Sequence, residues 1–227
     1  MHLPLCKLLR TFTNLTLKER IFNLIHYIAD CHFYHGALNT KMDKRGFGSV
    51  EEMNEYMIEK WNNKVTKSDT VVILGDLSLG TVDETNELIH RLNGKLCLIV
   101  GNHDKYVGKP GFDAGRFEWI DNYREITDSQ KRVICSHYPI PFYEGQYRKR
   151  HNGEAKNYML YGHVHETRDE ILMQKIVKLI RETPYYPIGS EHESTIPCNM
   201  INCFCKRSDY TPLTLSEWIR LNDSLLE

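Results

Sequence analysis

The 227-residue sequence has no excess of either charge and no apolar run long enough to cross a bilayer. Its 29 Lys and Arg residues nearly balance its 30 Asp and Glu residues, so no overall field draws the protein toward nucleic acid or an anionic membrane. Near the amino terminus, polar residues interrupt the apolar ones and no small-residue cleavage site follows. We therefore expect no secretory signal and no membrane partner, and any anionic substrate must be attracted locally.

The cysteines do not form an even set that would indicate a disulfide framework. There are seven of them, and Cys97 and Cys135 lie inside strand-like apolar runs, which predicts reduced thiols in a cytoplasmic protein. Cys203 and Cys205 are expected to be two residues on one face of a strand rather than half of a zinc site.

The sequence contains no internal repeat and no low-complexity segment, and its length suits one hydrophobic core. Residues 1–20 carry no recognisable chemistry and are predicted to be an amino-terminal extension, with a short helix near residues 17–22. Residues 21–227 are predicted to form a single domain.

Alternating apolar runs and amphipathic segments predict an α/β chain. Ser49 and Glu52 have the spacing of a capping box at the start of a helix. In the first half the order is strand, helix, strand, helix, strand, which implies parallel pairing through right-handed crossovers. Strands are expected in the last part of 21–29 and at 70–74, 96–100, 119–125, 131–137, 158–161 and 199–206, and the later helices at 83–93, 168–182 and 215–226.

Side chains that bind metals or move protons follow directly after these strands. The least common string is Gly-Asn-His-Asp at 101–104, which ends a buried apolar run. The others are Asp-Cys-His at 30–32, Gly-Asp at 75–76, His137, and Gly-His-Val-His at 162–165. Strand alternation would place Asp30 and His32 on one face with Cys31 opposite, so a catalytic thiol is not expected.

The combined donor set points to a metal site. Carboxylates, imidazoles and an amide suit Mn²⁺, Fe or Zn²⁺ better than Ca²⁺, and the lack of a cysteine ligand argues against a structural zinc. Seven ligands are too many for one ion and fit two ions if one carboxylate bridges them. The seven predicted ligands are Asp30, His32, Asp76, Asn102, His137, His163 and His165.

Each of these features also has an ordinary structural explanation. A single Gly-Asp after a strand is usually a turn, and two histidines two residues apart are more often surface residues than ligands. Five such features in order, each after a strand, favour the metal site. His35 is open between contact with substrate phosphate and a surface position, and the basic loop at 148–150 is more often a solvated face than an anion clamp.

In this order the motifs resemble those of the calcineurin-like metallophosphoesterase superfamily: D-x-H, G-D, G-N-H-D/E, H and G-H-x-H. The resemblance covers about residues 27–165, and the tail to about residue 218 resembles small bacterial and phage members. It implies an α/β (α+β) fold with two mixed β-sheets in a sandwich flanked by helices (αββα). It also implies a dinuclear metal site at the carboxyl ends of the strands.

The resemblance also implies the roles of the ligands. It assigns Asp30, His32 and His165 to the first metal, and Asp76 to both metals. The second metal receives His163, His137 and Asn102. Two divalent ions are expected, with Mn²⁺ the first choice and Fe, Zn²⁺, Ni²⁺ or Mg²⁺ as alternatives.

The expected activity is hydrolysis of a small phosphomonoester or phosphodiester, with a slight preference for diesters. A hydroxide bridging the two ions would attack phosphorus directly, without a covalent enzyme intermediate. His103 would donate a proton to the leaving oxygen or stabilise its charge, and Asp104 would orient His103. The alternatives are a non-catalytic binding scaffold on the same fold, or a nuclease, which the neutral charge disfavours.

Overall fold

The computed structural model describes residues 23–151 and 153–226. The predicted extension at residues 1–20 and the helix expected near 17–22 lie outside this part of the chain. Among the described residues, no helix combines the length and apolarity needed to span a membrane.

Five strands form the first sheet, in the order β4-β3-β2-β1-β9. Four of them run parallel, and β9 pairs antiparallel with β1. The alternation of strands and helices predicts the parallel pairing of the first three, β1, β2 and β3. The strands are β1 (Ile25–Ile28), β2 (Thr70–Ile73), β3 (Lys95–Ile99), β4 (Phe117–Asp121) and β9 (Leu213–Thr214).

Four further strands form the second sheet, in the order β5-β6-β7-β8. Here β6, β7 and β8 are parallel, and β5 is antiparallel to β6. The strands are β5 (Tyr123–Asp128), β6 (Lys131–Ser136), β7 (Asn157–Tyr161) and β8 (Met200–Asn202). Two mixed sheets flanked by helices confirm the predicted fold class.

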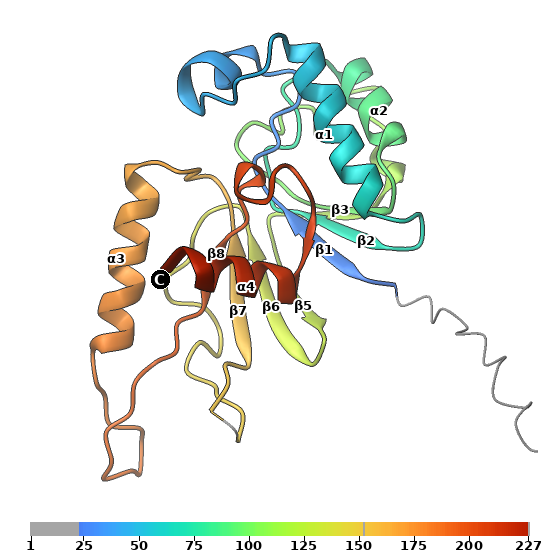
Figure 1. The fold of residues 1–227 in the computed structure, drawn as a ribbon. Coiled ribbons are helices and arrows are strands. Elements are labelled where there is room, and N and C mark those ends of the chain that lie inside the picture. Colours follow the sequence, from blue (N-terminus) through green and yellow to red (C-terminus); the bar gives the residue numbers. More distant parts are fainter. Residues whose placement is uncertain (1–22, 152, 227) are drawn as a thin grey trace, which may run out of the picture.

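The helices flank the two sheets (Figure 1). Helices α1 (Val50–Lys64) and α2 (Val82–Arg91) pack on the outer face of the first sheet, and α3 (Arg168–Glu182) packs on the outer face of the second. Helix α4 (Leu215–Leu226) lies beside β1 and β8, where its Trp218 donates an indole hydrogen bond to the Tyr27 carbonyl. Short turns of helix occur at Leu38–Met42, Ala114–Arg116 and Cys205–Ser208.

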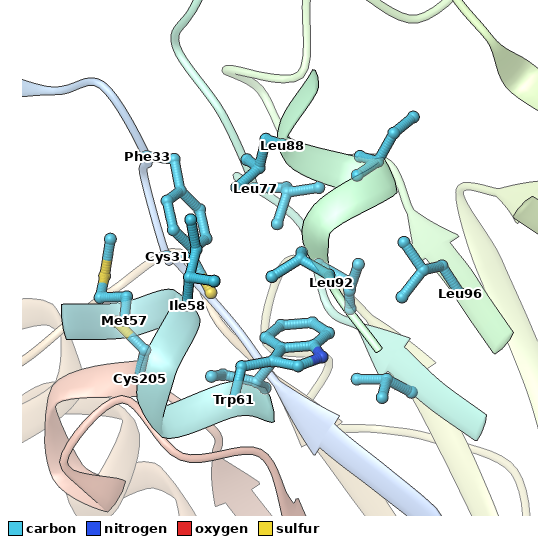
Figure 2. Packing of buried hydrophobic residues seen from close by; sticks show 14 of the residues in the cluster. Cys31, Phe33, Met57, Ile58, Trp61, Leu77, Leu88, Leu92, Leu96 and Cys205 are labelled. Atoms are coloured by element: carbon cyan, nitrogen blue, oxygen red, sulfur yellow. The ribbon is translucent and has the colours of Figure 1, made fainter. Parts of the chain in front are cut away.

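Three apolar clusters hold these layers together. One joins α1 and α2 to the first sheet around the buried indole of Trp61 (Figure 2). The second lies between the sheets and includes Cys97 and Cys135, which explains why these two cysteines lie in apolar runs. The third lies under α3. Strand ends on one edge of this rigid framework are therefore held in fixed positions.

Two predicted strands differ from the structure. The strand expected at 119–125 is two strands in different sheets, because β4 pairs with β3 whereas β5 forms a hairpin with β6. Ser129 and Gln130, in the turn of this hairpin, both have positive φ. Glycine usually occupies such positions, and without it the sequence does not mark the turn.

The strand expected at 199–206 ends at Asn202, whose side chain accepts a hydrogen bond from the Phe204 amide. Cys203 therefore packs between the sheets while Cys205 packs in the cluster under α1, and the two are not on one strand face.

The start of α4 provides a test of stability against pH. Glu217 accepts hydrogen bonds from the Lys64 ammonium and from the amide and hydroxyl of Thr214. Partial burial raises the pKa of Glu217, but these bonds outweigh it and lower the pKa from 4.5 to about 2. The resulting stabilisation is present above pH 4.5 and is lost as the pH falls toward 2.

We therefore expect Glu217→Gln to lower the free energy of unfolding at pH 7 by about 1–2 kcal/mol, after allowing for solvent screening of this partly exposed pair. Urea denaturation at pH 7 and at pH 3 measures the effect. The difference from wild type should shrink at pH 3, and the exposed Glu59→Gln serves as a control. A difference that stays constant or grows toward acid would contradict this explanation.

Candidate metal centre

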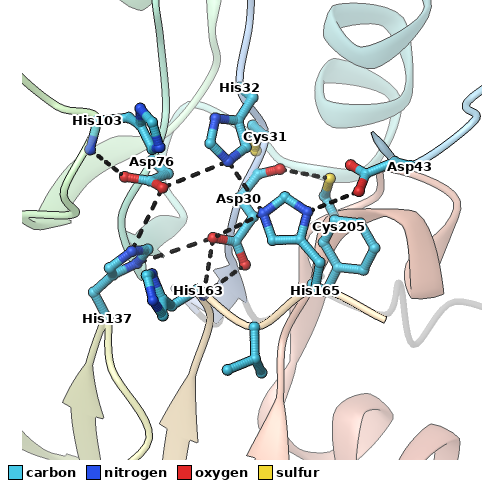
Figure 3. Close-up of polar contacts among 12 residues, drawn as sticks. Asp30, Cys31, His32, Asp43, Asp76, His103, His137, His163, His165 and Cys205 are labelled. Atoms are coloured by element: carbon cyan, nitrogen blue, oxygen red, sulfur yellow. Dashed lines mark hydrogen bonds and ion pairs between the residues drawn. The ribbon is translucent and has the colours of Figure 1, made fainter. Parts of the chain in front are cut away.

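The seven predicted ligands lie together at the carboxyl ends of five strands. Figure 3 labels all of them except Asn102. They follow β1, β2, β3, β6 and β7, which come from both sheets. The parallel strands of a sheet end at the same edge, so residues distant in sequence converge there. The predicted grouping of these side chains is thus present in the structure.

On one side of the cluster, two imidazoles face each other beside two carboxylates. The Nε2 atoms of His32 and His165 are 3.2 Å apart, and His32 Nε2 is 3.5 Å from Asp76 Oδ2. Asp30 Oδ1 lies 3.7 Å from His165 Nε2. All four side chains are buried.

The other side of the cluster reaches solvent. His137 Nε2 lies 3.5 Å from Asp76 Oδ2 and 3.0 Å from Asn102 Oδ1. The same amide oxygen is 2.9 Å from His163 Nδ1. Because Asn102 and His163 are exposed while Asp30 and Asp76 are buried, the cluster opens toward solvent through this side.

Two groups of three side chains have ligand atoms within 4.8 Å of one another and could each hold a metal ion. They are Asp30 with His32 and His165, and Asp30 with Asp76 and His137. Asp30 belongs to both groups, whereas Asp76 Oδ2 is equally distant from His32 and His137. The assignment of Asp76 as the bridging carboxylate stays a prediction.

The backbone of the ligand-bearing loops is left-handed at most of the predicted ligands. Five of them have φ between 47° and 70°, namely Asp30, His32, Asp76, His163 and His165. This conformation is unfavourable for residues other than glycine and concentrates at functional sites. Asp30 and His32 do converge, but through these turns beyond the end of β1 and not through the strand alternation that we predicted.

Two motif glycines allow the loops to approach the carboxylates. A Cβ atom on Gly101 would lie 2.2 Å from Asp76 Oδ1, and one on Gly162 would lie 2.6 Å from Asp30 Oδ2. Neither position has room for a side chain. The glycines of the Gly-Asn-His-Asp and Gly-His-x-His strings are thus explained by close packing against two predicted ligands.

The electrostatics of the cluster suit a bound cation. Burial raises the pKa of the Asp30 carboxyl well above its usual range, and burial together with the neighbouring His165 and Arg45 lowers the pKa of His32. Burial also lowers the pKa of His163. Buried carboxylates need a positive partner and neutral imidazoles are metal ligands, so this donor set fits divalent ions.

His103 and His35 lie at the rim of this cluster. The His103 amide donates to Asp76 Oδ1 at 2.8 Å, and its half-buried ring lies 5.3 Å from the ring of His32. The His35 ring is 5.6 Å from His32 and 6.5 Å from His103. His35 is therefore adjacent to the candidate site, and its contact with substrate remains a prediction.

Asp104 has a different set of partners from the one predicted. Its Oδ2 accepts from the amides of Asp76 and Gly101, and its Oδ1 accepts from the Leu77 amide and the Tyr106 hydroxyl, all at 2.8 Å. Among the described contacts, none joins Asp104 to the His103 ring. The buried carboxylate instead ties the loop after β2 to the loop after β3.

Asp104→Asn is therefore expected to lower the free energy of unfolding of the metal-free protein by about 2–4 kcal/mol, because the amide nitrogen of Asn faces donors that lose their acceptor. Chemical denaturation in the presence of a chelator measures this. Unchanged stability combined with lost activity would instead support the predicted role of Asp104 in orienting His103.

Three contributors to the site escaped prediction. The Leu74 carbonyl lies 2.9 Å from His137 Nδ1, and the Asp43 carboxylate lies 2.9 Å from His165 Nδ1. The half-exposed Tyr138 ring lies 4.4 Å from the ring of His163. None belongs to a ligand motif. Of the three, Tyr138 could have been found from the sequence, because it directly follows the predicted ligand His137.

A family model for the calcineurin-like phosphoesterase superfamily domain matches residues 24–179, well over half of the chain. The chain belongs to this superfamily. Membership supports phosphate ester hydrolysis and divalent metal binding in general terms, and the buried His and Asp groups are candidate ligands.

Several proteins are similar in sequence to parts of this chain. An uncharacterised protein of Methanocaldococcus jannaschii is 44% identical over 84 residues, which cover 36% of this chain and 47% of the relative. Gene 66 protein of Mycobacterium phage L5 is 38% identical over 34% of this chain and 38% of its own. The chain thus spans less than half the length of these two relatives.

Gene 66 protein of Mycobacterium phage D29 matches over a longer stretch, with 28% identity across 62% of this chain and 78% of its own. A crystal structure of an Aquifex aeolicus protein of unknown function has a TM-score of 0.58 and 22% identity, and covers 87% of this chain and 98% of its own. This likeness concerns the fold.

Proposed function

We propose that the protein is a phosphoesterase that uses two divalent metal ions to hydrolyse a small phosphate ester with water as the nucleophile. The observation that carries this proposal is the convergence of seven nitrogen and oxygen donors from five strand ends, in a chain of the calcineurin-like phosphoesterase superfamily. In this proposal Asp30, His32 and His165 hold one ion.

The second ion would be held by His137, His163 and Asn102, with Asp76 shared between the two. When bound, two divalent ions lower the pKa of a water molecule and offset the charge of phosphoryl oxygens. The buried ligands, Asp30 and Asp76 among them, would keep bulk water from the inner side of the centre. Substrate would therefore enter from the solvent side, past Asn102 and His163.

His103 is placed to act on the leaving group. Its amide is fixed to Asp76, while its ring is half-exposed at the rim of the cluster. A protonated imidazole there can donate a proton to the departing oxygen, which is the usual work of a general acid. We assign this role to His103 and a substrate-contacting role to His35.

The finer parts of the proposal concern substrate, metal and location. We propose Mn²⁺ as the metal and a small phosphate ester as the substrate, with diesters slightly preferred. The balanced charge of the chain supports a small substrate over nucleic acid. The six described cysteines are buried free thiols, which supports a reducing, cytoplasmic setting.

A direct test is the hydrolysis of bis(p-nitrophenyl) phosphate and p-nitrophenyl phosphate by chelator-treated protein, before and after addition of Mn²⁺. Turnover should depend on Mn²⁺ and be somewhat faster on the diester. Metal binding without turnover of any ester would favour the scaffold alternative, and cleavage of single-stranded or duplex DNA would favour a nuclease.

A further inference from the structure

A buried carboxylate outside the ligand motifs contacts one of the predicted ligands. Asp43 lies in the loop that precedes α1, and its Oδ1 is 2.9 Å from Nδ1 of His165 (Figure 3). The two side chains are 7% and 10% exposed. Because an ionised carboxylate can only accept, the Nδ1 atom of His165 must carry the proton in this contact. The other ring nitrogen, Nε2, faces His32 and Asp30.

Asp43 is itself held by a fully buried guanidinium. Arg45 donates through Nε and Nη2 to Asp43 Oδ2, at 3.1 and 3.0 Å. The remaining donors of Arg45 reach the carbonyls of Cys31 at 2.7 Å and Asp30 at 3.1 Å. One side chain thus fixes both the carboxylate behind His165 and the left-handed turn that carries Asp30 and His32.

Two further contacts restrict the ring of His165 and the backbone of Asp43. The His165 ring stacks on Phe204 at 4.6 Å between centroids with an interplanar angle of 28°, which limits tilting but still permits the half-turn flip about χ2 that exchanges Nδ1 with Cδ2. Lys206 donates to the Asp43 carbonyl at 2.8 Å and so fixes the backbone of the carboxylate. The hydrogen bond from Nδ1 to Asp43 is then the restraint that directs Nε2.

We propose that Asp43 is a positioning residue that holds His165 in the tautomer with the proton on Nδ1, so that Nε2 presents its lone pair to the metal site. Arg45 fixes Asp43 in turn. A carboxylate in this position orients a ligating imidazole and increases its basicity, and loss of such a partner typically weakens metal binding 10- to 100-fold. The proposal rests on the proposed function, since it assigns His165 to a metal.

His137 provides an internal comparison. Its Nδ1 contacts the neutral Leu74 carbonyl, which also directs Nε2 toward the cluster but carries no charge. Both imidazoles thus direct Nε2 toward the cluster. His137 is oriented by a neutral carbonyl, and His165 by a negatively charged carboxylate. The chain also contains a matched pair outside the site: His90 and Asp113 are 2.9 Å apart on the surface.

The test compares Asp43→Ala, Asp43→Asn and the control Asp113→Ala. Long-range ¹H–¹⁵N NMR of the metal-free proteins reports the tautomer of His165, and calorimetric titration with Mn²⁺ reports the Kd. Asp43→Ala should lose the preference for the proton on Nδ1 and raise the Kd for Mn²⁺ about 10- to 100-fold. Asp113→Ala should match the wild type in both.

Asp43→Asn keeps an oxygen acceptor without the charge and preserves the volume. It should retain the tautomer while raising the Kd by a smaller factor, about 3- to 10-fold, and it decides the question if Asp43→Ala fails to fold. If Asp43 had only a structural role, its substitution would lower the melting temperature and leave the tautomer of His165 and the Kd for Mn²⁺ unchanged. That result would overturn the proposal. Wild-type protein that binds no Mn²⁺ would instead contradict the proposed function, and the NMR comparison would still judge Asp43.

Discussion

Asp76→Asn is expected to reduce kcat/KM for phosphate ester hydrolysis by at least about 10³-fold. Asp76 Oδ2 lies 3.5 Å from both His32 and His137, so this oxygen lies between the two halves of the cluster. Asparagine has nearly the same size but no negative charge. The variant therefore removes the charge that two cations would share while leaving the packing around Gly101 intact.

The measurement is steady-state turnover of both p-nitrophenyl esters with saturating Mn²⁺, alongside unfolding of the metal-free protein. Asp30 and Asp104 are also buried here, and the negative charges of the three carboxylates repel one another. Removing one charge should therefore leave the free energy of unfolding of the metal-free protein unchanged or raise it. Asp113→Asn is the matched surface control. Activity of Asp76→Asn within 10-fold of wild type would contradict the assignment of Asp76 to both metals.

The second large effect concerns the leaving group. His103→Ala is expected to lower kcat by about 10²- to 10⁴-fold for an ester with a poor leaving group such as an alkyl alcohol. For p-nitrophenolate, which departs without protonation, the loss should be much smaller. The half-exposed His103 ring lies at the rim of the cluster, where it can reach the leaving group. The substitution keeps the amide of His103, which holds Asp76.

Comparing a methyl ester and a p-nitrophenyl ester of the same phosphate measures this difference. His90→Ala, a surface histidine paired with Asp113, controls for loss of an imidazole in general. An equal loss of activity on both esters would show that His103 does not serve the leaving group.

The sequence predicted the framework well where burial controls it. The apolar runs that became β2, β3, β6 and β7 are buried, and α3 and α4 begin and end at the predicted residues. Ligand convergence followed from the same reasoning, since parallel strands end at one edge.

What the sequence did not reveal depends on long-range contacts and on backbone conformation. Asp and His adopt positive φ more often than most other non-glycine residues, but residue type does not specify it at Asp30, His32 and His163, where the packing around them imposes it. Asp43 lies 122 residues from His165 in a polar loop, where an acidic side chain is ordinarily solvated. Asp104 was predicted to orient its neighbour His103, but its carboxylate instead accepts hydrogen bonds from backbone amides of two loops.

The central claim, a centre for two metal ions, is tested most directly by counting the ions. Native mass spectrometry of the full chain loaded with Mn²⁺, together with EPR spectroscopy, gives the number bound per chain and shows whether they are magnetically coupled. We predict two coupled Mn²⁺ ions per chain in the wild type and loss of coupling in Asp76→Asn. One ion or none at saturating Mn²⁺ would contradict the dinuclear centre.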